Sequence, residues 1–275
     1  MIKEIKKAHN NYITNIKYYL DLRNKRDLII SISRDNNNIK IWNFKNWNLI
    51  TDIKEIYDSG ALNSASFLNN NNEIYILTSN SISNKEEESG QIKIYNLEGN
   101  KIDELFDFNI RTFFIDIYND NKLSKIFIIT GNPGYCISYN YNDKKIYHKY
   151  IDIDKNYSGH YSLIINSSEE MVKLIESSFD GYIRIWNFHS GLILNKININ
   201  SGHLYGICLL HNKYLFVGCK DKTIKIIDLK NEKICETLIN HNREVICIKV
   251  INNYNTLFLL SQGRGKDQIK LWKIE

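Results

Sequence analysis

The sequence has little proline, an odd number of cysteines and no long apolar run, and each lack excludes a class of protein. A single proline, Pro133, in 275 residues excludes collagen-like and proline-rich linker proteins. The five cysteines include no C-x-x-C pair, so we expect buried thiols in a reducing compartment rather than a disulfide framework or a zinc site. No apolar run approaches the roughly 18 residues of a membrane span, and the N-terminus lacks a secretory signal pattern. We therefore expect a cytoplasmic chain without a membrane span, with the nucleus as the alternative location.

The net charge of +5 is modest and is spread along the chain. A dedicated nucleic-acid binder usually gathers its lysines and arginines into one patch or stripe. Here four lysines of a repeated motif each stand between two apolar residues, as expected where a strand alternates between two faces: Lys40, Lys93, Lys225 and Lys270. Specific nucleic-acid binding is therefore not expected. Hydrophobic residues make up 43% of the chain and aromatic residues 12%, which is enough for a packed core.

One short pattern recurs along the whole chain. The segment Ile183–Phe188 (IRIWNF) repeats the pattern of Ile39–Phe44 (IKIWNF), and weaker copies follow the same alternation. A large apolar residue anchors each copy, and the six anchors are 41 to 53 residues apart: Trp42, Tyr95, Tyr139, Trp186, Ile227 and Trp272. A fixed period of about 40–45 residues is the signature of a repeat architecture.

Each unit also contains further short runs of apolar residues, separated by polar turns. In the fourth unit these runs are Tyr161–Asn166, Val172–Ser177 and Leu192–Ile197. Strands of about five residues at this spacing indicate an all-β protein. No segment of about twelve residues keeps the apolar period of a helix, so few helices or none are expected.

The fourth unit carries the fullest motif, which runs Gly159-His160, then Ser178-Phe179-Asp180-Gly181, then Trp186-Asn187. On these residues, and on partial copies in the first, fifth and sixth units that begin at Ala8-His9, Gly202-His203 and Asn240-His241, residues 1–275 resemble the WD-repeat β-propeller family. The resemblance implies a single domain of four-stranded blades. Six units imply six blades, and seven blades are the alternative because seven-bladed rings are common in that family.

The resemblance also indicates how the two ends of the chain meet. Ile2–Lys7 is similar to Cys235–Ile239, and the last unit ends directly after its third strand. We expect Ile2–Lys7 to complete the last blade, which would protect open sheet edges. The longest interval between anchors contains Asn80–Gly90, which we expect to be a solvated loop between two strands of blade two; a partner-binding loop is the alternative.

The family motif implies a hydrogen-bonded network inside each blade, because a buried imidazole and a buried indole N–H need partners. The motif match assigns the fullest set to His160, Ser178, Asp180 and Trp186, and a second set to His9, Ser33, Asp35 and Trp42. These residues are expected to be structural. A catalytic role is disfavoured because the repeat itself explains why they recur.

Propellers of this family usually act through loops on one rim, which the motif match places just after each histidine and just before each turn aspartate. These positions are rich in aromatic and basic residues, the types enriched at interaction hot spots: Tyr12, Arg34, Tyr161, Phe179, Tyr205, Lys220, Asn242, Arg243 and Arg264. One hypothesis is that this rim binds an acidic or phosphorylated peptide segment. The alternative is an ordinary solvated rim without a ligand.

No set of residues predicts an enzyme, a cofactor or a metal. Gly263-Arg264-Gly265-Lys266 lacks the spacing of a phosphate-binding loop, and His148, His189 and His211 are far apart in the sequence. We therefore expect a non-catalytic protein–protein interaction scaffold that binds other proteins. The alternative is a constitutive subunit of a larger complex of the coat, nuclear-pore or ubiquitin-ligase type.

Overall fold

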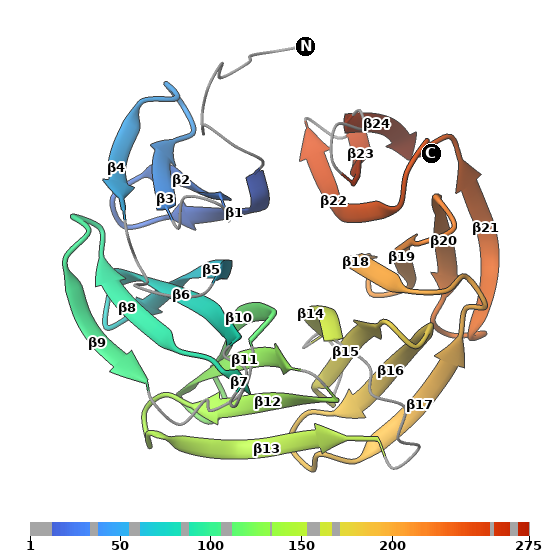
Figure 1. Ribbon diagram of the computed structural model, residues 1–275, viewed down its shortest axis with the longest axis horizontal. Coiled ribbons are helices and arrows are strands. Elements are labelled where there is room, and N and C mark those ends of the chain that lie inside the picture. Colours follow the sequence, from blue (N-terminus) through green and yellow to red (C-terminus); the bar gives the residue numbers. More distant parts are fainter. Residues whose placement is uncertain are drawn as a thin grey trace. The chain divides into compact units, whose positions relative to one another are not determined.

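The chain is built of β-strands and turns (Figure 1). The computed structural model describes residues 13–33, 38–54, 61–83, 88–105, 112–132, 134–152, 160–166, 171–253, 256–264 and 269–274, and no helix occurs among them. Isoleucine and other branched residues fill these strands because their stiff side chains pack well on a pleated surface. The predicted all-β class is confirmed.

The described strands form six sheets, one for each predicted unit, and consecutive strands of a sheet are neighbours except at the short strand Glu88–Ser89, which pairs only with the strand before it. We number these sheets as blades one to six, because four-stranded meanders of this kind are the repeating element of a β-propeller. The predicted fold class with six blades is therefore confirmed, and the seven-blade alternative is not. All six anchors lie on the third main strand of their blade, at Trp42, Tyr95, Tyr139, Trp186, Ile227 and Trp272.

The chain divides into two compact units, which are described separately. The first comprises Met1–Asn132 with Tyr139–Lys145, and the second comprises Pro133–Ser138 with Ile146–Glu275. Blades one and two lie in the first unit, blades four to six lie in the second, and the strands of blade three belong to both.

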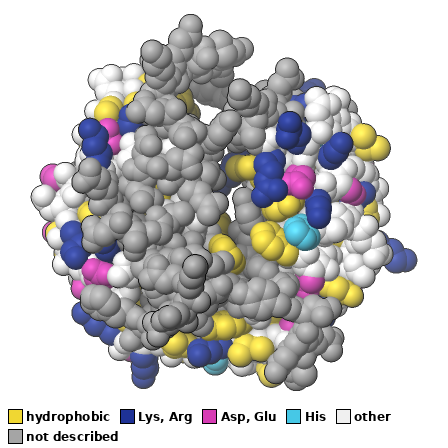
Figure 2. Space-filling view, viewed as in Figure 1, with side chains coloured by type: hydrophobic (Ala, Val, Ile, Leu, Met, Phe, Trp, Pro, Cys, Tyr) yellow, Lys and Arg dark blue, Asp and Glu magenta, His cyan; other side chains and the backbone are white. Residues whose placement is uncertain are grey.

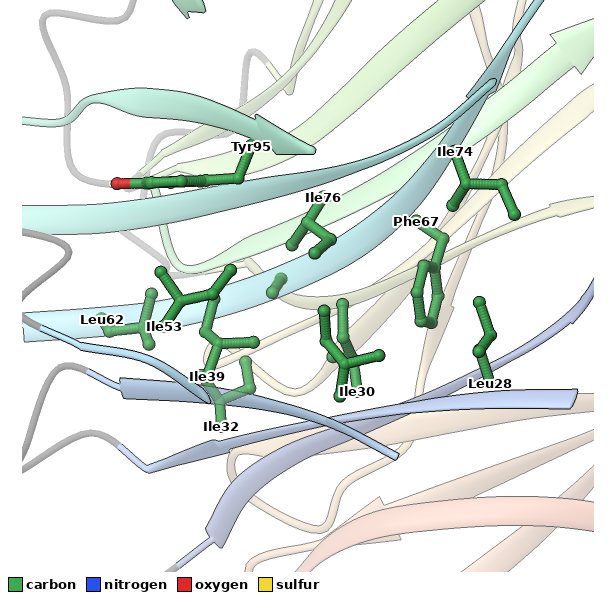
Figure 3. Close-up of a cluster of buried hydrophobic side chains, with 12 residues drawn as sticks. Leu28, Ile30, Ile32, Ile39, Ile53, Leu62, Phe67, Ile74, Ile76 and Tyr95 are labelled. Atoms are coloured by element: carbon green, nitrogen blue, oxygen red, sulfur yellow. The ribbon is translucent and has the colours of Figure 1, made fainter. Parts of the chain in front are cut away.

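Blades one and two bury a shared core. Blade one contains β1 (Ile13–Asp21), β2 (Arg26–Ser33), β3 (Asn38–Asn43) and β4 (Leu49–Ile53). Blade two contains β5 (Ala61–Asn70), β6 (Glu73–Ser83), β7 (Glu88–Ser89), β8 (Ile92–Asn96) and β9 (Lys101–Leu105). Figure 3 shows Ile30 and Ile39 of blade one opposite Leu62 and Ile76 of blade two, and all four are fully buried. Alternate residues of each strand supply this core, as a pleated strand requires.

The predicted loop at Asn80–Gly90 is wrong in part. Strand β6 continues to Ser83, and its end pairs with β7 through Ile82–Ser89 and Ser83–Glu88. The insertion therefore extends a hairpin beyond the sheet before the chain returns to β8. The backbone N–H of Gln91 is held by the Asn80 side chain at 2.8 Å, which fixes the point where the chain rejoins the blade.

Blade three and the blades of the second unit have the same meander order. Blade three contains β10 (Phe114–Asp120), β11 (Lys125–Asn132), β12 (Tyr135–Asn140) and β13 (Lys145–Ile151). Blade four contains β14 (His160–Asn166), β15 (Lys173–Ser178), β16 (Tyr182–Asn187) and β17 (Ile193–Asn198). Blade five contains β18 (Leu204–Leu210), β19 (Tyr214–Cys219), β20 (Thr223–Asp228) and β21 (Lys233–Ile239). Blade six contains β22 (Val245–Asn253), β23 (Thr256–Gly263) and β24 (Ile269–Ile274).

Adjacent blades of the second unit pack face to face. One buried cluster joins Ile175 and Ile183 of blade four to Leu215 and Val217 of blade five. Another joins Phe216 and other residues of blade five to Val245, Ile248 and Leu259 of blade six. Blade six has three described strands, and the segment Ile2–Lys7 that is predicted to complete it lies outside the described residues.

The five cysteines are free thiols, but they are not all buried as the sequence predicted. Cys136, Cys208 and Cys219 are buried, whereas Cys235 and Cys247 are exposed. None of the described segments forms a helix that could span a lipid bilayer.

Candidate interaction site on blades four to six

The predicted hydrogen-bonded network is most complete in blade six. The indole N–H of Trp272 donates to Ser261 Oγ at 2.8 Å, and His241 Nε2 lies 2.7 Å from the same oxygen. His241 and Ser261 are both buried. The sequence identified His241 and Trp272 as repeat residues of this blade but missed Ser261, which lies two residues before the end of β23.

In blade one the indole acceptor also lies two residues before the end of the second strand, so one predicted network residue is wrong. The indole N–H of Trp42 donates to Ser31 Oγ at 2.8 Å and not to Ser33. Ser33 Oγ is buried and has no hydrogen-bond partner among the described residues. Its predicted partners His9 and Asp35 lie outside the described residues, so their roles stay predictions.

Blade four replaces the serine with a carboxylic acid. The tryptophan of each blade pairs with a residue of the second strand, and the acceptor of the indole N–H lies two residues after that partner. In blade one Trp42 pairs with Ile29 and the acceptor position is Ser31; in blade six Trp272 pairs with Leu259 and the position is Ser261. In blade four Trp186 pairs with Leu174, and the same position is Glu176. The buried indole N–H of Trp186 has no partner among the described residues. The predicted bond between Trp186 and the serine–aspartate pair is therefore absent from this described region.

Ser178 and Asp180 do interact, and Arg184 holds them together. The Ser178 hydroxyl donates to Asp180 Oδ1, while Arg184 Nη1 donates to Ser178 Oγ at 2.6 Å. Arg184 Nη2 reaches Asp180 Oδ2 at 2.5 Å. Burial alone would raise the pKa of Asp180, but the hydrogen bonds from Arg184 and Ser178 outweigh it and lower the pKa.

Arg184 is also the shared cation of two further carboxylates. Its Nε donates to Asp152 Oδ2 at 2.7 Å and lies 3.9 Å from Glu176 Oε1. The side chain of Arg184 is only 2% exposed, and that of Glu176 is fully buried. Burial would lower the pKa of Arg184, but its bonds to Asp180 and Asp152 raise it, so the guanidinium stays charged.

Glu176 links this ionic cluster to blade three. The thiol of Cys136, on β12, donates to Glu176 Oε2 at 2.5 Å. Burial raises the pKa of this thiol, and the neighbouring carboxylate of Glu176 raises it further. Cys136 is therefore a protonated donor rather than a nucleophile.

The rim residues follow from the strand register. Val245 pairs with Gly263 at the start of blade six, and Leu204 pairs with Cys219 at the start of blade five. The next residues outward, Glu244 with Arg264 and His203 with Lys220, continue these ladders through backbone hydrogen bonds of 2.8 and 2.9 Å. Blades five and six thus each present one pair of side chains just beyond their first two strands.

His160 occupies a different place from the one predicted for a network histidine. It begins β14 opposite Ser178, where blade six has Val245 opposite Gly263. His241, by contrast, stands four residues before Val245. The side chains of His160 and Tyr161 lie outside the described part of the structure, as do Tyr12 and Arg34.

Three aromatic side chains meet at the rim of blades four and five. The rings of Phe179 and His203 stack with centroids 4.9 Å apart and planes 16° apart. The Tyr205 ring meets Phe179 edge-on at 5.9 Å, and its hydroxyl donates to Glu244 Oε2 at 3.3 Å. Phe179 and Tyr205 were predicted at the rim, whereas His203 was taken only as the repeat histidine of unit five.

Two glycines allow blade six to approach this group closely. A Cβ at Gly218 would lie 2.4 Å from the carbonyl oxygen of Val245, and one at Gly206 would lie 2.8 Å from that of Ile246. Only a residue without a side chain permits such an approach of two backbones. The approach brings Glu244, which precedes Val245, into contact with Tyr205.

The charges at this rim are more mixed than the sequence suggested. Arg264 Nη1 is 2.7 Å from Glu244 Oε2, and the Arg264 guanidinium lies 5.9 Å from the centre of the Tyr205 ring. Lys220 and Arg243 are exposed and form no ion pair with a described residue. Glu244 therefore corrects the expectation that the rim is basic and aromatic with few acidic groups.

We call this group the rim cluster and define it by seven residues: Phe179, His203, Tyr205, Lys220, Arg243, Glu244 and Arg264. In Figure 2, basic, acidic, histidine and hydrophobic side chains lie next to one another to the right of the grey atoms, a mixture that matches this composition. Partial burial lowers the pKa of His203, and the positive charge of Lys220 lowers it further. The imidazole is therefore neutral at pH 7.

The described residues contain no group of three metal-ligating side chains. His148 and His189, which the sequence treated as isolated, lie together, because His148 Nε2 bonds to the His189 carbonyl oxygen. Sequence reasoning missed His203 and Glu244 as rim residues. The signal that identifies both is their position, one residue before the first strand of a blade and opposite a residue that had been predicted.

Comparison with known proteins gives one distant match. No family model matches the chain. A stretch of 72 residues is 26% identical to the U3 small nucleolar RNA-associated protein 21 homolog of Schizosaccharomyces pombe. The match is partial. It covers 26% of this chain and 8% of that relative, so the relative's activity and partners do not transfer with it. Together with the six blades, it supports a place in the WD-repeat propeller family and identifies no particular member.

Proposed function

We propose that this chain is a protein-interaction module that binds an acidic or phosphorylated segment of a partner through the rim cluster. The observation that carries the proposal is that two exposed cations without a described ion-pair partner, Lys220 and Arg243, belong to the same rim as two half-buried rings. These rings, Phe179 and His203, stack on each other and pack against the buried Tyr205. Charged donors bind carboxylate or phosphate groups strongly, and aromatic residues supply much of the energy at interfaces.

The blades would act by holding these side chains in place. Phe179 directly follows β15, Lys220 directly follows β19, and Tyr205 is the second residue of β18. These strands are fixed by paired backbones and buried cores. A rigid frame lowers the entropy lost on binding. We expect the module to display this surface without catalysing a reaction.

The experiment that tests the proposal is affinity purification of the chain from cell extract at low and high salt, with partners quantified by mass spectrometry. The charge-reversed variant Lys220→Glu/Arg243→Glu is expected to lose partners more than tenfold, because two cations would become repulsive to an acidic segment. The matched control is Lys230→Glu/Lys233→Glu, which makes the same charge change at the opposite end of β20. If both variants keep the full set of partners, the rim cluster is not the binding surface.

A second candidate is a constitutive subunit of a larger assembly, in the cytoplasm or the nucleus. The observation that favours it is the name of the distant relative, which associates that protein with the U3 small nucleolar RNA. The same purification separates the two candidates. A fixed set of stoichiometric partners that survives high salt supports the subunit, whereas salt-sensitive partners support the module.

A further inference from the structure

The rim cluster already contains an acidic group bound to one of its cations. Glu244 Oε2 accepts a hydrogen bond from Arg264 Nη1 at 2.7 Å and another from the Tyr205 hydroxyl at 3.3 Å. Both bonds use the same oxygen, and Oε1 makes none with a described residue. A carboxylate is thus held against a guanidinium beside an aromatic ring, which is the arrangement expected for an acidic ligand at this surface.

Blade five shows the same position without such a group. His203 stands at the place of Glu244, and Lys220 stands at the place of Arg264. The His203 ring stacks on Phe179, and its neutral form brings no negative charge to Lys220. One rim cation is therefore open to a ligand anion, whereas the other is occupied by a side chain of the protein.

We propose that Glu244 is a built-in competitor for the anion-binding position at Arg264. This inference rests on the proposed function, because it assumes that the rim cluster binds acidic segments. An incoming carboxylate or phosphate takes the place of the Glu244 carboxylate, which swings out into solvent. The Glu244 side chain is 23% exposed and that of Arg264 is 62% exposed, so neither has to leave a closed core.

The size of the effect follows from the strength of the ion pair. Partly exposed pairs of this kind are weak, so the closed state outweighs the open one by roughly two- to fivefold. A ligand that binds only the open state then has its affinity reduced by the fraction of molecules that are open. Removing the competitor should strengthen the binding of acidic ligands by about three- to sixfold.

The test measures fluorescence anisotropy with a labelled hexaglutamate peptide, and with hexaglutamine as the neutral control. Glu244→Gln keeps the size of the side chain and removes its charge. This variant is expected to bind hexaglutamate about three- to sixfold more tightly than the natural protein, with no change for hexaglutamine. In the Arg264→Gln background the same substitution should give little or no gain, because the contested position is gone.

The outcomes separate this inference from the function on which it rests. If Lys220→Ala/Arg243→Ala weakens hexaglutamate binding while Glu244→Gln leaves it unchanged or weaker, the competitor is disproved and the binding surface stands. A gain that persists fully in the Arg264→Gln background also overturns the competitor, because it shows general repulsion instead. If no protein binds hexaglutamate, the proposed function fails and the inference fails with it. Circular dichroism and thermal unfolding confirm that each variant is folded.

Discussion

Blade four and blade six hold their anchor tryptophans at the same register, but they surround them with different chemistry. In blade six the indole N–H of Trp272 and the ring of His241 form a compact hydrogen-bonded network around Ser261. In blade four Glu176 takes the serine position and joins Arg184, Asp152 and Asp180 in a buried ionic cluster. The comparison shows that the same arrangement of strands can surround its tryptophan with either a hydrogen-bonded network or an ionic cluster. The ionic cluster leaves the Trp186 indole N–H without a described acceptor.

The largest expected effect comes from removing the cation of blade four. Arg184→Met should destabilise the protein by about 3–5 kcal/mol, because it removes the cation shared by the buried Glu176 and the half-buried Asp180. Asp152 keeps its ion pair with Lys196 at 2.7 Å. Urea denaturation followed by circular dichroism measures this loss. Lys225→Met changes the corresponding, more exposed cation of blade five and should cost about 1 kcal/mol or less. Equal losses in the two variants would contradict the special role of Arg184.

Blade six should respond more weakly to loss of its central hydroxyl. Ser261→Ala removes the oxygen shared by His241 and Trp272, and leaving buried polar groups unpaired costs about 1–3 kcal/mol. The same urea denaturation experiment measures the loss of stability in Ser261→Ala. A loss as large as that of Arg184→Met would show that the hydrogen-bonded network of blade six is as sensitive as the ionic cluster of blade four.

The two blades should also differ in their response to acid. The pKa of Asp180 is lower in the folded protein than in the unfolded chain, so its contribution is present above about pH 4 and is lost as the pH falls through the folded pKa. Asp180→Asn should therefore be less stable at pH 7 and should lose less stability than the natural protein between pH 5 and pH 2. Ser261→Ala should keep the natural pH dependence. Thermal unfolding across this pH range distinguishes them.

The smallest effect is expected when blade four is given the serine of blade six. Glu176→Ser should change the stability by about 1 kcal/mol or less, since Arg184 keeps Asp152 and Asp180 and the indole gains an acceptor. The indole N–H signal of Trp186 in a ¹H–¹⁵N spectrum should move downfield, toward the signals of Trp42 and Trp272. An unmoved signal would mean that the serine does not reach the indole.

The sequence predicted the order of strands and blades well because both follow from a regular sequence repeat. The anchors at Trp42, Trp186 and Trp272 stand on third strands as expected, since alternation and a repeat of about 45 residues leave little freedom. The rim residues Phe179, Lys220 and Arg264 were predicted from their turns, and each follows directly after the second strand of its blade.

Features that depend on exact pairing could not be predicted in the same way. The acceptor for the indole lies two residues earlier than the serine chosen by motif, and only the strand register shows that Glu176 replaces it. The hairpin of β6 and β7 was mistaken for a loop because its polar residues resemble a turn. Glu244 was overlooked because its role depends on contacts with two distant residues, Tyr205 and Arg264.

Because Cys136 is buried against the ionic cluster of blade four, the rate at which its thiol reacts with a reagent reports local opening of that cluster. A thiol reagent reacts with the thiolate at an accessible sulfur, and Cys136 is both buried and held protonated. Cys235 and Cys247 are exposed and should be labelled at once. The later labelling of Cys136, identified by peptide mass, then reports openings that separate Glu176 from blade three. The rate of this labelling measures how often the structure opens locally at this thiol.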